Sequence, residues 1–257
     1  MRSIVFAKRN FIELSRDVLG YIFCIAFPIV MLIVMSVVNE SIPKQAGMTI
    51  FRIDNLAGGV IIFGQTFIML FTAIQVTNDR SSSFLMRLFS SPMKGKDFTL
   101  GYILPMLLVS VIQSMVTFIA ALIIAKIVGY DLNIAGLGLA VITTLPSAMM
   151  FIAIGLIFGS ILNEKSAPGV CSVIVSAGTF LGGVFFDAEG VGGGIYKVCK
   201  CLPFIYCTRV ARTCISLNFN EAFDRFWLPL IVTMGSALVM TVIGICVFSR
   251  QMKADNR

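Results

Sequence analysis

Four cysteines crowded into one late segment are the first residues of this sequence whose type and spacing could do chemistry. They are Cys199, Cys201, Cys207 and Cys214. Such thiols either pair as disulfides in an oxidising space or stay free. These cysteines include no Cys-x-x-Cys pair, which would indicate a zinc site. The sequence also contains no histidine, which is the commonest metal ligand and general base. We therefore expect no catalytic, cofactor-binding or metal site on this chain.

A polar stretch at residues 78–101 is the second place where residue types point to a function. Its apolar residues recur at helical spacing, at Phe84, Leu85, Leu88 and Phe89. Arg80 and Arg87 are among its polar positions, and Ser91-Pro92 ends the pattern, because a residue before proline disfavours the helical conformation. The stretch predicts a short amphipathic helix between two long apolar runs.

The composition predicts an all-α membrane protein. Of the 257 residues, 58% are hydrophobic and only 13% are charged, whereas soluble domains have about 25% charged residues. Six apolar runs are each long enough to cross roughly 30 Å of hydrocarbon at about 1.5 Å per residue. We place these spans at 18–38, 56–77, 101–126, 134–162, 167–187 and 227–249, and Pro146 predicts a kink or tilt in the fourth. The whole chain, 1–257, is expected to form a single transmembrane domain.

The basic residues predict how the chain is oriented. The net charge is +7, which on a membrane protein reports topology and not nucleic-acid binding. Lysine and arginine gather at the N-terminus, in the 78–100 loop and at the C-terminus, and six spans would place these three segments on one side. The positive-inside rule makes that side the cytoplasm. We expect a multi-pass protein of the plasma membrane with both termini in the cytoplasm.

Two segments outside the spans have patterns of their own. Residues 1–17 repeat apolar side chains every three and four positions among charges, which predicts an amphipathic helix in the membrane interface. Lys8, Arg9 and Phe11 are its candidate functional residues. Residues 188–226, on the outer side, open with glycines and then become too apolar for a free loop. A re-entrant helical hairpin fits this pattern, and a plain surface loop is the alternative.

The expected spans carry no charged residue near their middles. Such a residue usually marks a proton or ion pathway, so a proton-driven pump, a voltage sensor and a charge-selective channel are disfavoured. An intramembrane enzyme is also disfavoured, because no base stands beside a serine or cysteine. The sequence has no Gly-x-x-x-x-Gly-Lys-Ser/Thr loop for ATP. Energy for uphill transport would therefore enter from a partner, and 78–100 is the largest cytoplasmic element available to receive it.

Two weakly polar stripes lie within the spans. Thr72 and Gln75 share a face of the second span, and Ser172, Ser176 and Thr179 share a face of the fifth. Each stripe is either a substrate path or dimer seam, or a close helix contact, where small residues are enriched anyway.

The pattern as a whole resembles the type-2 ATP-binding-cassette (ABC) export permeases. Two segments carry the resemblance, NDRSSSFLMRLFSSPMKGKDFTLGYIL and CLPFIYCTRVAR. The matching residues are Asp79, Arg80, Arg87, Leu88, Ser91, Pro92, Leu100 and Gly101 in the first segment, and Pro203, Tyr206 and Arg212 in the second. The sequence departs from the family pattern at Ser82, Ser83, Met86 and Arg209.

The resemblance implies a half-transporter. Two permease chains, identical or paralogous, would work with two ATPase subunits, which bind ATP and Mg²⁺ in place of this chain. The 78–100 element would be the coupling helix. Its coupling residues would be Asp79, Arg80, Phe84, Arg87, Leu88, Ser91 and Pro92. The functional residues of the re-entrant segment would be Pro203, Tyr206 and Arg212. The expected function is export of a hydrophobic drug or antimicrobial peptide. The alternative is a membrane scaffold or sensor subunit that recruits a cytoplasmic protein.

Overall fold

The computed structural model describes residues 2–43, 49–82, 95–217 and 223–255, and every regular element in these ranges is a helix. The all-α prediction is confirmed for this part of the chain. The helices are α1 (Arg2–Leu14), α2 (Val18–Tyr21), η1 (Ile22–Ala26), α3 (Phe27–Ser41), α4 (Ile53–Ser81), α6 (Gly95–Val128), α7 (Ile134–Thr143), α8 (Leu145–Ile161), α9 (Ala167–Leu181), α10 (Ala188–Val191), α11 (Gly193–Cys201), α12 (Phe204–Ser216), η3 (Phe223–Trp227) and α13 (Leu228–Asp255).

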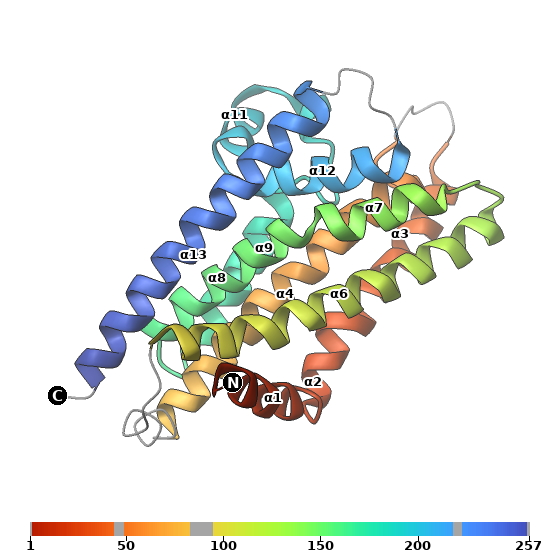
Figure 1. The fold of residues 1–257 in the computed structure, drawn as a ribbon. Coiled ribbons are helices and arrows are strands. Elements are labelled where there is room, and N and C mark those ends of the chain that lie inside the picture. The colour runs from red at the N-terminus through yellow and green to blue at the C-terminus, as the bar shows by residue number, and fades with distance from the viewer. Residues whose placement is uncertain (1, 44–48, 83–94, 218–222, 256–257) are drawn as a thin grey trace.

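The long helices run alongside one another, and the two ends of the bundle differ (Figure 1). Both termini lie at one end, where α1 packs against α6 and contacts the end of α4 through Arg9 and Asp79. We call this the terminal end. The short helices α11 and α12 lie at the other end, which we call the distal end (Figure 1). The bundle thus brings the two segments singled out in the sequence, the N-terminal helix and the late cysteine-rich segment, to opposite ends.

Five helical stretches in the described residues are long and apolar enough to cross a membrane. They are Val18–Ser41, Ile53–Ser81, Asp97–Val128, Ile134–Ile161 and Phe223–Gln251. Each overlaps an expected span, and the fourth is interrupted at Thr144, with Pro146 in the first turn of α8. The remaining expected span, 167–187, corresponds to α9, whose 15 residues would cover about 22 Å at the usual rise per residue. Six crossings therefore remain a prediction.

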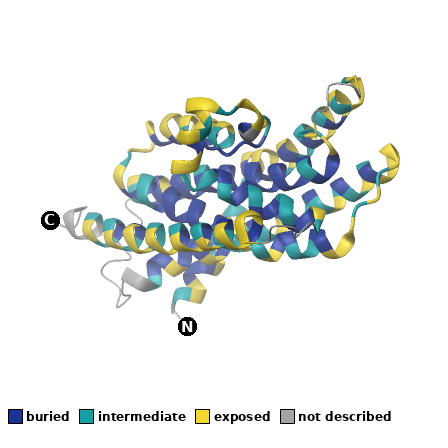
Figure 2. Cartoon of the chain, turned by 90° about the horizontal axis from the view of Figure 1, so that it is seen from above, coloured by how far each residue is buried: buried dark blue, intermediate teal, exposed yellow. Residues whose placement is uncertain are grey.

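Helix α4 is the centre of the bundle, and it packs against α3, α6, α8, α9 and α12. In its most apolar stretch 89% of the residues are buried, compared with 17% in α13 and its leading turn. Yet the mean hydropathy of these stretches is 1.9 for α4 and 2.4 for the last span. A water-soluble protein would show the reverse. Figure 2 shows exposed positions recurring along the helix that ends at the C-terminus, as expected for a helix whose outer face meets lipid.

Glycines allow α8 to approach α4 closely. A Cβ atom at Gly159 would lie 2.7 Å from Val76 Cβ and 2.9 Å from the Ala73 carbonyl oxygen. A Cβ atom at Gly155 would collide with the carbonyl oxygen of Met69. Small residues commonly permit such backbone contact between membrane helices, so the Gly155-x-x-x-Gly159 spacing fixes the position of α8 on the central helix.

Candidate functional site

A buried carboxylate joins three helices at the terminal end. Asp79, in the last turns of α4, is 3% exposed. Arg9 of α1 donates through Nη1 to both carboxylate oxygens at 2.9 and 3.0 Å. Tyr102 of α6 donates its hydroxyl to Oδ2 at 2.7 Å. Removing a carboxylate from water costs several kcal/mol unless partners of this kind replace the water, so Asp79 ties α1 and α6 to the end of α4.

Further contacts seat α1 on this junction. Asn10 is fully buried and donates through Nδ2 to the Gly101 carbonyl at 3.0 Å, and its own carbonyl accepts from Gln75 Nε2 at 3.4 Å. The ring of Phe6 fills the space that a side chain at Gly101 would need, and it meets the Tyr102 ring edge-on at 5.2 Å. This contact explains why a glycine precedes Tyr102.

Glu13, one helical turn after Arg9 on α1, adds a second carboxylate to the junction. Arg9 also pairs with Glu13 at 2.9 Å. The pKa of the Glu13 carboxyl is raised, and burial is the main cause. The positive charge of Arg9 opposes this rise, and the negative charge of Asp79 adds to it. The guanidinium of Arg9 thus lies between two carboxylates, one buried and one half-exposed.

The neighbouring residue, Arg80, ties α4 to a different helix. Its Nη1 donates to the carbonyls of Gly159 and Leu162 at 3.1 and 3.2 Å. These groups lie at the C-terminal end of α8, where carbonyls lack helical partners and a cation is favourable. The terminal end of α4 is therefore attached to α1 and α6 through Asp79 and to α8 through Arg80.

The structure brings one predicted residue of the N-terminal interface helix together with one predicted coupling residue. Arg9 and Asp79 are in direct contact, whereas Lys8 is exposed and Phe11 is half-buried. The other predicted coupling residues lie outside the described residues: Phe84, Arg87, Leu88, Ser91 and Pro92. Sequence reasoning missed Asn10 and Tyr102. Each is adjacent to a predicted residue, Arg9 and Gly101, but neither has a charge or spacing that marks it as a partner of α4.

The residues of the two intramembrane stripes occupy different environments. Thr72 is fully buried, donates to the Ile68 carbonyl and faces Gly155, and Gln75 is also buried. On α9, Ser172 and Ser176 are exposed, and their hydroxyls donate to carbonyls of their own helix at 2.8 and 3.0 Å. Thr179 is half-buried and likewise donates to Val175. Hence the α4 stripe faces neighbours within this chain, and the α9 stripe faces outward.

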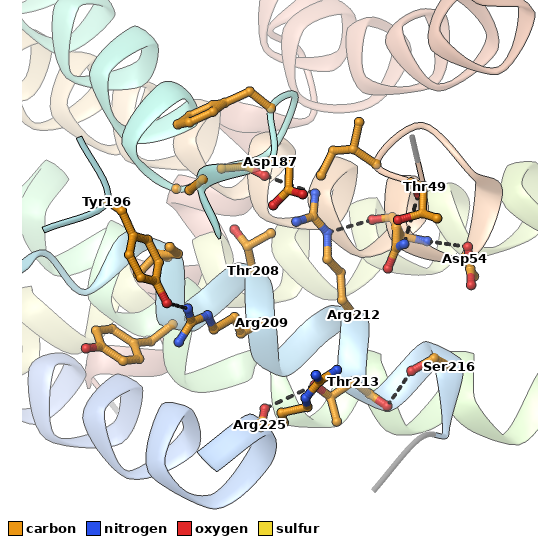
Figure 3. Close-up of a pocket in the computed structure, with 18 of the residues that line it drawn as sticks. Thr49, Asp54, Asp187, Tyr196, Thr208, Arg209, Arg212, Thr213, Ser216 and Arg225 are labelled. Carbon is orange, nitrogen blue, oxygen red and sulfur yellow. Dashed lines mark hydrogen bonds between the residues drawn. The ribbon is translucent and has the colours of Figure 1, made fainter. Parts of the chain in front are cut away.

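A large cavity opens at the distal end, with a volume of about 800 Å³ (Figure 3). Its walls come from the segment leading into α4, the segment after α9, helices α11 and α12, and η3. The basic residues on its walls are Arg52, Lys200, Arg209, Arg212 and Arg225, and the acidic ones are Asp54, Asp187 and Asp224.

Arg212 holds the cavity walls together. Its Nε donates to the Asn55 carbonyl at 3.0 Å, and its Nη2 donates to the carbonyls of Gly183 and Val184 at 3.0 Å each. Figure 3 shows this side chain extending from α12 toward the segment that begins α4. A Cβ atom at Gly58 would lie 2.9 Å from the Arg212 backbone nitrogen, so that glycine lets α12 lie directly on α4.

A second ionic group lies at the start of α4. Arg52 donates to both oxygens of Asp54, at 2.8 and 2.6 Å, and Tyr130 donates its hydroxyl to Asp54 at 3.1 Å. Hydrogen bonding to Asp54 raises the pKa of Arg52. Burial, followed by the Asp54 charge, raises the pKa of Tyr130. The group joins the α6–α7 connection to the first turn of α4.

The other predicted residues of the 188–226 segment stabilise its two main helices. Pro203 precedes the first turn of α12. The Tyr206 hydroxyl donates to the Lys200 carbonyl at 3.0 Å, which links α12 back to α11, and Arg209 donates to the Tyr196 hydroxyl at 2.8 Å. The segment does form helices, so it is not a plain loop, and its depth in a membrane remains a prediction.

The four late cysteines are all free thiols. Cys199, Cys207 and Cys214 are buried, and Cys201 is exposed. No group of three or more histidine, cysteine or acidic side chains in the described ranges could hold a metal ion. In the described residues, charged hydrogen bonds attach the helices at both ends of the bundle, around Asp79 at the terminal end and around Arg212 at the distal end.

Comparison with known proteins identifies the family. The sequence model of the family described as ABC-2 type transporter matches residues 3–216, which include α1, the Asp79 junction and α12. No curated protein matches the chain. Family members are the membrane components of transporters whose ATP hydrolysis takes place on separate ATPase subunits. Because the match covers far more than half of the sequence, this chain is a multi-pass membrane permease that belongs to the ABC-2 type transporter family.

Proposed function

We propose that this chain is an export permease that receives mechanical work at its terminal end. Two copies, or one copy and a paralogue, would pair with two ATPases that bind ATP and Mg²⁺. The observation that carries the proposal is the Asp79 junction, where α1 and α6 meet the end of α4. Residues 83–94 connect α4 to α6, so a push on that connection would reach all three helices.

The proposal assigns a topology as well. The terminal end faces the cytoplasm of the plasma membrane, because the basic residues of α1 and Arg80 at the end of α4 lie there. Helix α9 is the sixth crossing, and the local bilayer or neighbouring protein accommodates its short length. Helix α1 lies in the interface, where its exposed Ile4, Val5 and Ile12 would meet lipid. Helices α11 and α12 form the re-entrant hairpin on the outer side.

The proposed substrate is a hydrophobic drug or an antimicrobial peptide. The outward-facing apolar surfaces of the long helices are continuous with lipid and offer such a molecule no aqueous barrier. The exposed Ser172 and Ser176 on α9 provide a small, weakly polar face for a substrate path or for the second permease chain. Thr72 and Gln75 are buried on α4, so their contacts with neighbouring helices would change when α4 moves.

Transport in vesicles tests the proposal. Proteoliposomes would contain this permease and its ATPase subunits, with a lipophilic dye or a labelled antimicrobial peptide as substrate. We expect ATP-dependent movement of the substrate, and loss of that movement together with substrate-stimulated ATPase activity in Arg87→Glu/Leu88→Asp. Lys126→Glu, a charge reversal at an exposed site near the distal end of α6, serves as the control. ATPase recruitment without movement of any tested substrate would instead favour a scaffold or sensor.

A further inference from the structure

The fourth expected span is broken where α7 is followed by α8. Thr144 lies between the two helices, and Pro146 follows in the first turn of α8. Proline has no backbone N–H, so Pro146 cannot donate to the Ile142 carbonyl as another residue at this position could. Sharp bends in helices commonly occur at such prolines. The backbone is therefore already one hydrogen bond short at Thr144, which makes this the point where the span bends most readily.

The two halves of this span are held by different neighbours. Figure 1 shows α7 beside α12 toward the distal end, and α8 continuing toward the terminal end. A Cβ atom at Gly136 would lie 2.6 Å from the Cys214 carbonyl oxygen, so α7 lies directly on α12. Helix α8 lies instead on α4, at Gly155 and Gly159, and it also packs against α13. A change of angle at Thr144 would therefore move α7 and α12 relative to α8.

Gln65 of α4 connects to both sides of the break. It lies between Gly58, where α12 contacts α4, and Met69, where α8 contacts α4, and it is 1% exposed. Its Nε2 donates to the Thr144 carbonyl at 3.2 Å, and its Oε1 accepts from the Ser147 hydroxyl at 2.5 Å. One side chain thus bonds both the residue that ends α7 and the first turn of α8, which restrains the angle between the two helices.

The Ser147 hydroxyl has an alternative acceptor at the break. It lies 2.5 Å from Gln65 Oε1 and 2.6 Å from the Thr144 carbonyl oxygen, but its single hydrogen can form a strong bond with only one of them. Without Gln65, Ser147 can donate to Thr144, three residues back, which is a common serine contact. The Thr144 carbonyl also accepts from the Ala148 N–H at 3.1 Å. Release of Gln65 therefore leaves Thr144 and Ser147 paired.

We infer that Thr144 is a hinge between α7 and α8, and that Gln65 holds it at the observed angle. In the released state α7 tilts relative to α8 and carries α12 and the first turns of α4 with it. Gly64, beside Gln65, gives α4 its own flexible position at the same level, because glycine weakens a helix interior. The distal end can then change shape while the attachments of Asp79 and Arg80 stay intact. The hinge requires neither ATPases nor export, so it can hold or fail independently of the proposed function.

A distance between two spin labels, measured on the full chain in nanodiscs, tests the inference. The labels are attached through Ile134→Cys on α7 and Leu238→Cys on α13, at residues that are 66% and 67% exposed. Helix α13 reports the position of α8, because the two pack together. Cys201 and Cys246 are changed to serine, since the other five cysteines are buried. Helix α7 has ten residues, so a tilt of about 15° would move Ile134 by about 4 Å.

Removal of the Gln65 contacts should release the hinge. Gln65→Leu keeps a side chain of similar size but cannot bond Thr144 or Ser147. It should raise the population of a second distance, about 2–4 Å from the main one, about tenfold. Ser147→Ala removes one of the two contacts and should raise it about threefold. Gln75→Leu makes the same change about three turns further along α4, at a buried residue that contacts α1, and should leave the distances unchanged.

Replacement of the proline assigns the movement to the break. Pro146→Ala supplies a backbone N–H for the Ile142 carbonyl, so adding it to Gln65→Leu should return the second population to its original level. Thermal unfolding of each variant shows whether it is folded, and Ser147→Ala decides if Gln65→Leu does not fold. Unchanged distances in the folded variants, or an equal change in Gln75→Leu, would overturn the inference. A second population that Pro146→Ala does not reduce would also overturn it.

Discussion

Arg9 on the first helix and Asp79 at the end of the fourth lie 70 positions apart in the sequence, yet their side chains meet at 2.9 Å. The Asp79 side chain is 4% exposed and that of Arg9 is 35% exposed. The pair therefore attaches α1 to α4 and is not an ordinary surface salt bridge. Most of its effect on stability comes from compensating the charge of the buried Asp79 carboxylate.

Asp79→Asn should destabilise the protein by about 3 kcal/mol, because removing one member of a buried pair leaves the other without compensation. Arg9→Gln should have a similar effect, and the double variant should cost less than the sum, with a coupling of about 1–3 kcal/mol. Thermal unfolding in detergent measures each value. Lys8→Gln, next to Arg9 but exposed, is the control, and additive effects of the two substitutions would show that they do not interact.

Gly155→Ala should lower the melting temperature by several degrees. The added Cβ atom would meet the Met69 carbonyl oxygen, and such overpacking costs about 1–3 kcal/mol, which corresponds to roughly 2–4 °C per kcal/mol at this chain length. Gly169→Ala is the matched control, because nothing lies within 4 Å of its added Cβ atom. That variant should be unchanged or slightly more stable. Equal melting temperatures for the two variants would contradict the close α4–α8 contact.

Arg212→Lys should destabilise the distal end although it keeps the charge. A lysine ammonium cannot reproduce the planar fork that reaches three carbonyls on two segments, and each lost charged hydrogen bond is worth about 1–3 kcal/mol. Arg250→Lys makes the same substitution at an exposed site on α13 and should be neutral. Limited proteolysis of the 188–226 segment, compared between the two variants, locates the effect, and equal cleavage would argue against this role of Arg212.

Cysteine labelling tests the orientation in the membrane. Cys201 is exposed on α11, while Cys199, on the same helix, is fully buried. A membrane-impermeant maleimide should therefore label intact cells through Cys201, if the distal end faces outward. Cys201→Ser should abolish this labelling, and Cys199→Ser should leave it intact. Labelling of Cys201 only after the cells are opened would reverse the proposed orientation.

Five of the six expected spans overlap helices that are long and apolar enough to cross a membrane, because long apolar runs have few alternative explanations. The sequence could not show that α9 has only 15 helical residues, since the run 167–187 stays apolar beyond Leu181 while the backbone turns at Gly182 and Gly183. The repeat of apolar side chains over residues 1–17 also predicts a single apolar face on the N-terminal helix. In the structure Ala7 is buried with Phe6 and Asn10, whereas Ile4 is 65% exposed.

The junction residues show where periodicity stops being informative. Arg9 and Asp79 could be proposed from charge and family resemblance, but their pairing depends on how α1 crosses the bundle. Arg212 was recognised as a motif residue, yet its partners are backbone carbonyls of Asn55, Gly183 and Val184. Every residue has a carbonyl, so no pattern of side chains in the sequence identifies these particular acceptors.

Asp79 and Arg80 are consecutive, and consecutive side chains on a helix point about 100° apart. One is held by α1 and α6 and the other by α8. Turning α4 about its own axis would stretch one of these attachments or the other, whichever way it turned. The last turn of α4 is therefore held against rotation about its own axis. It can tilt or slide together with α1, α6 and α8, but it cannot rotate independently of them.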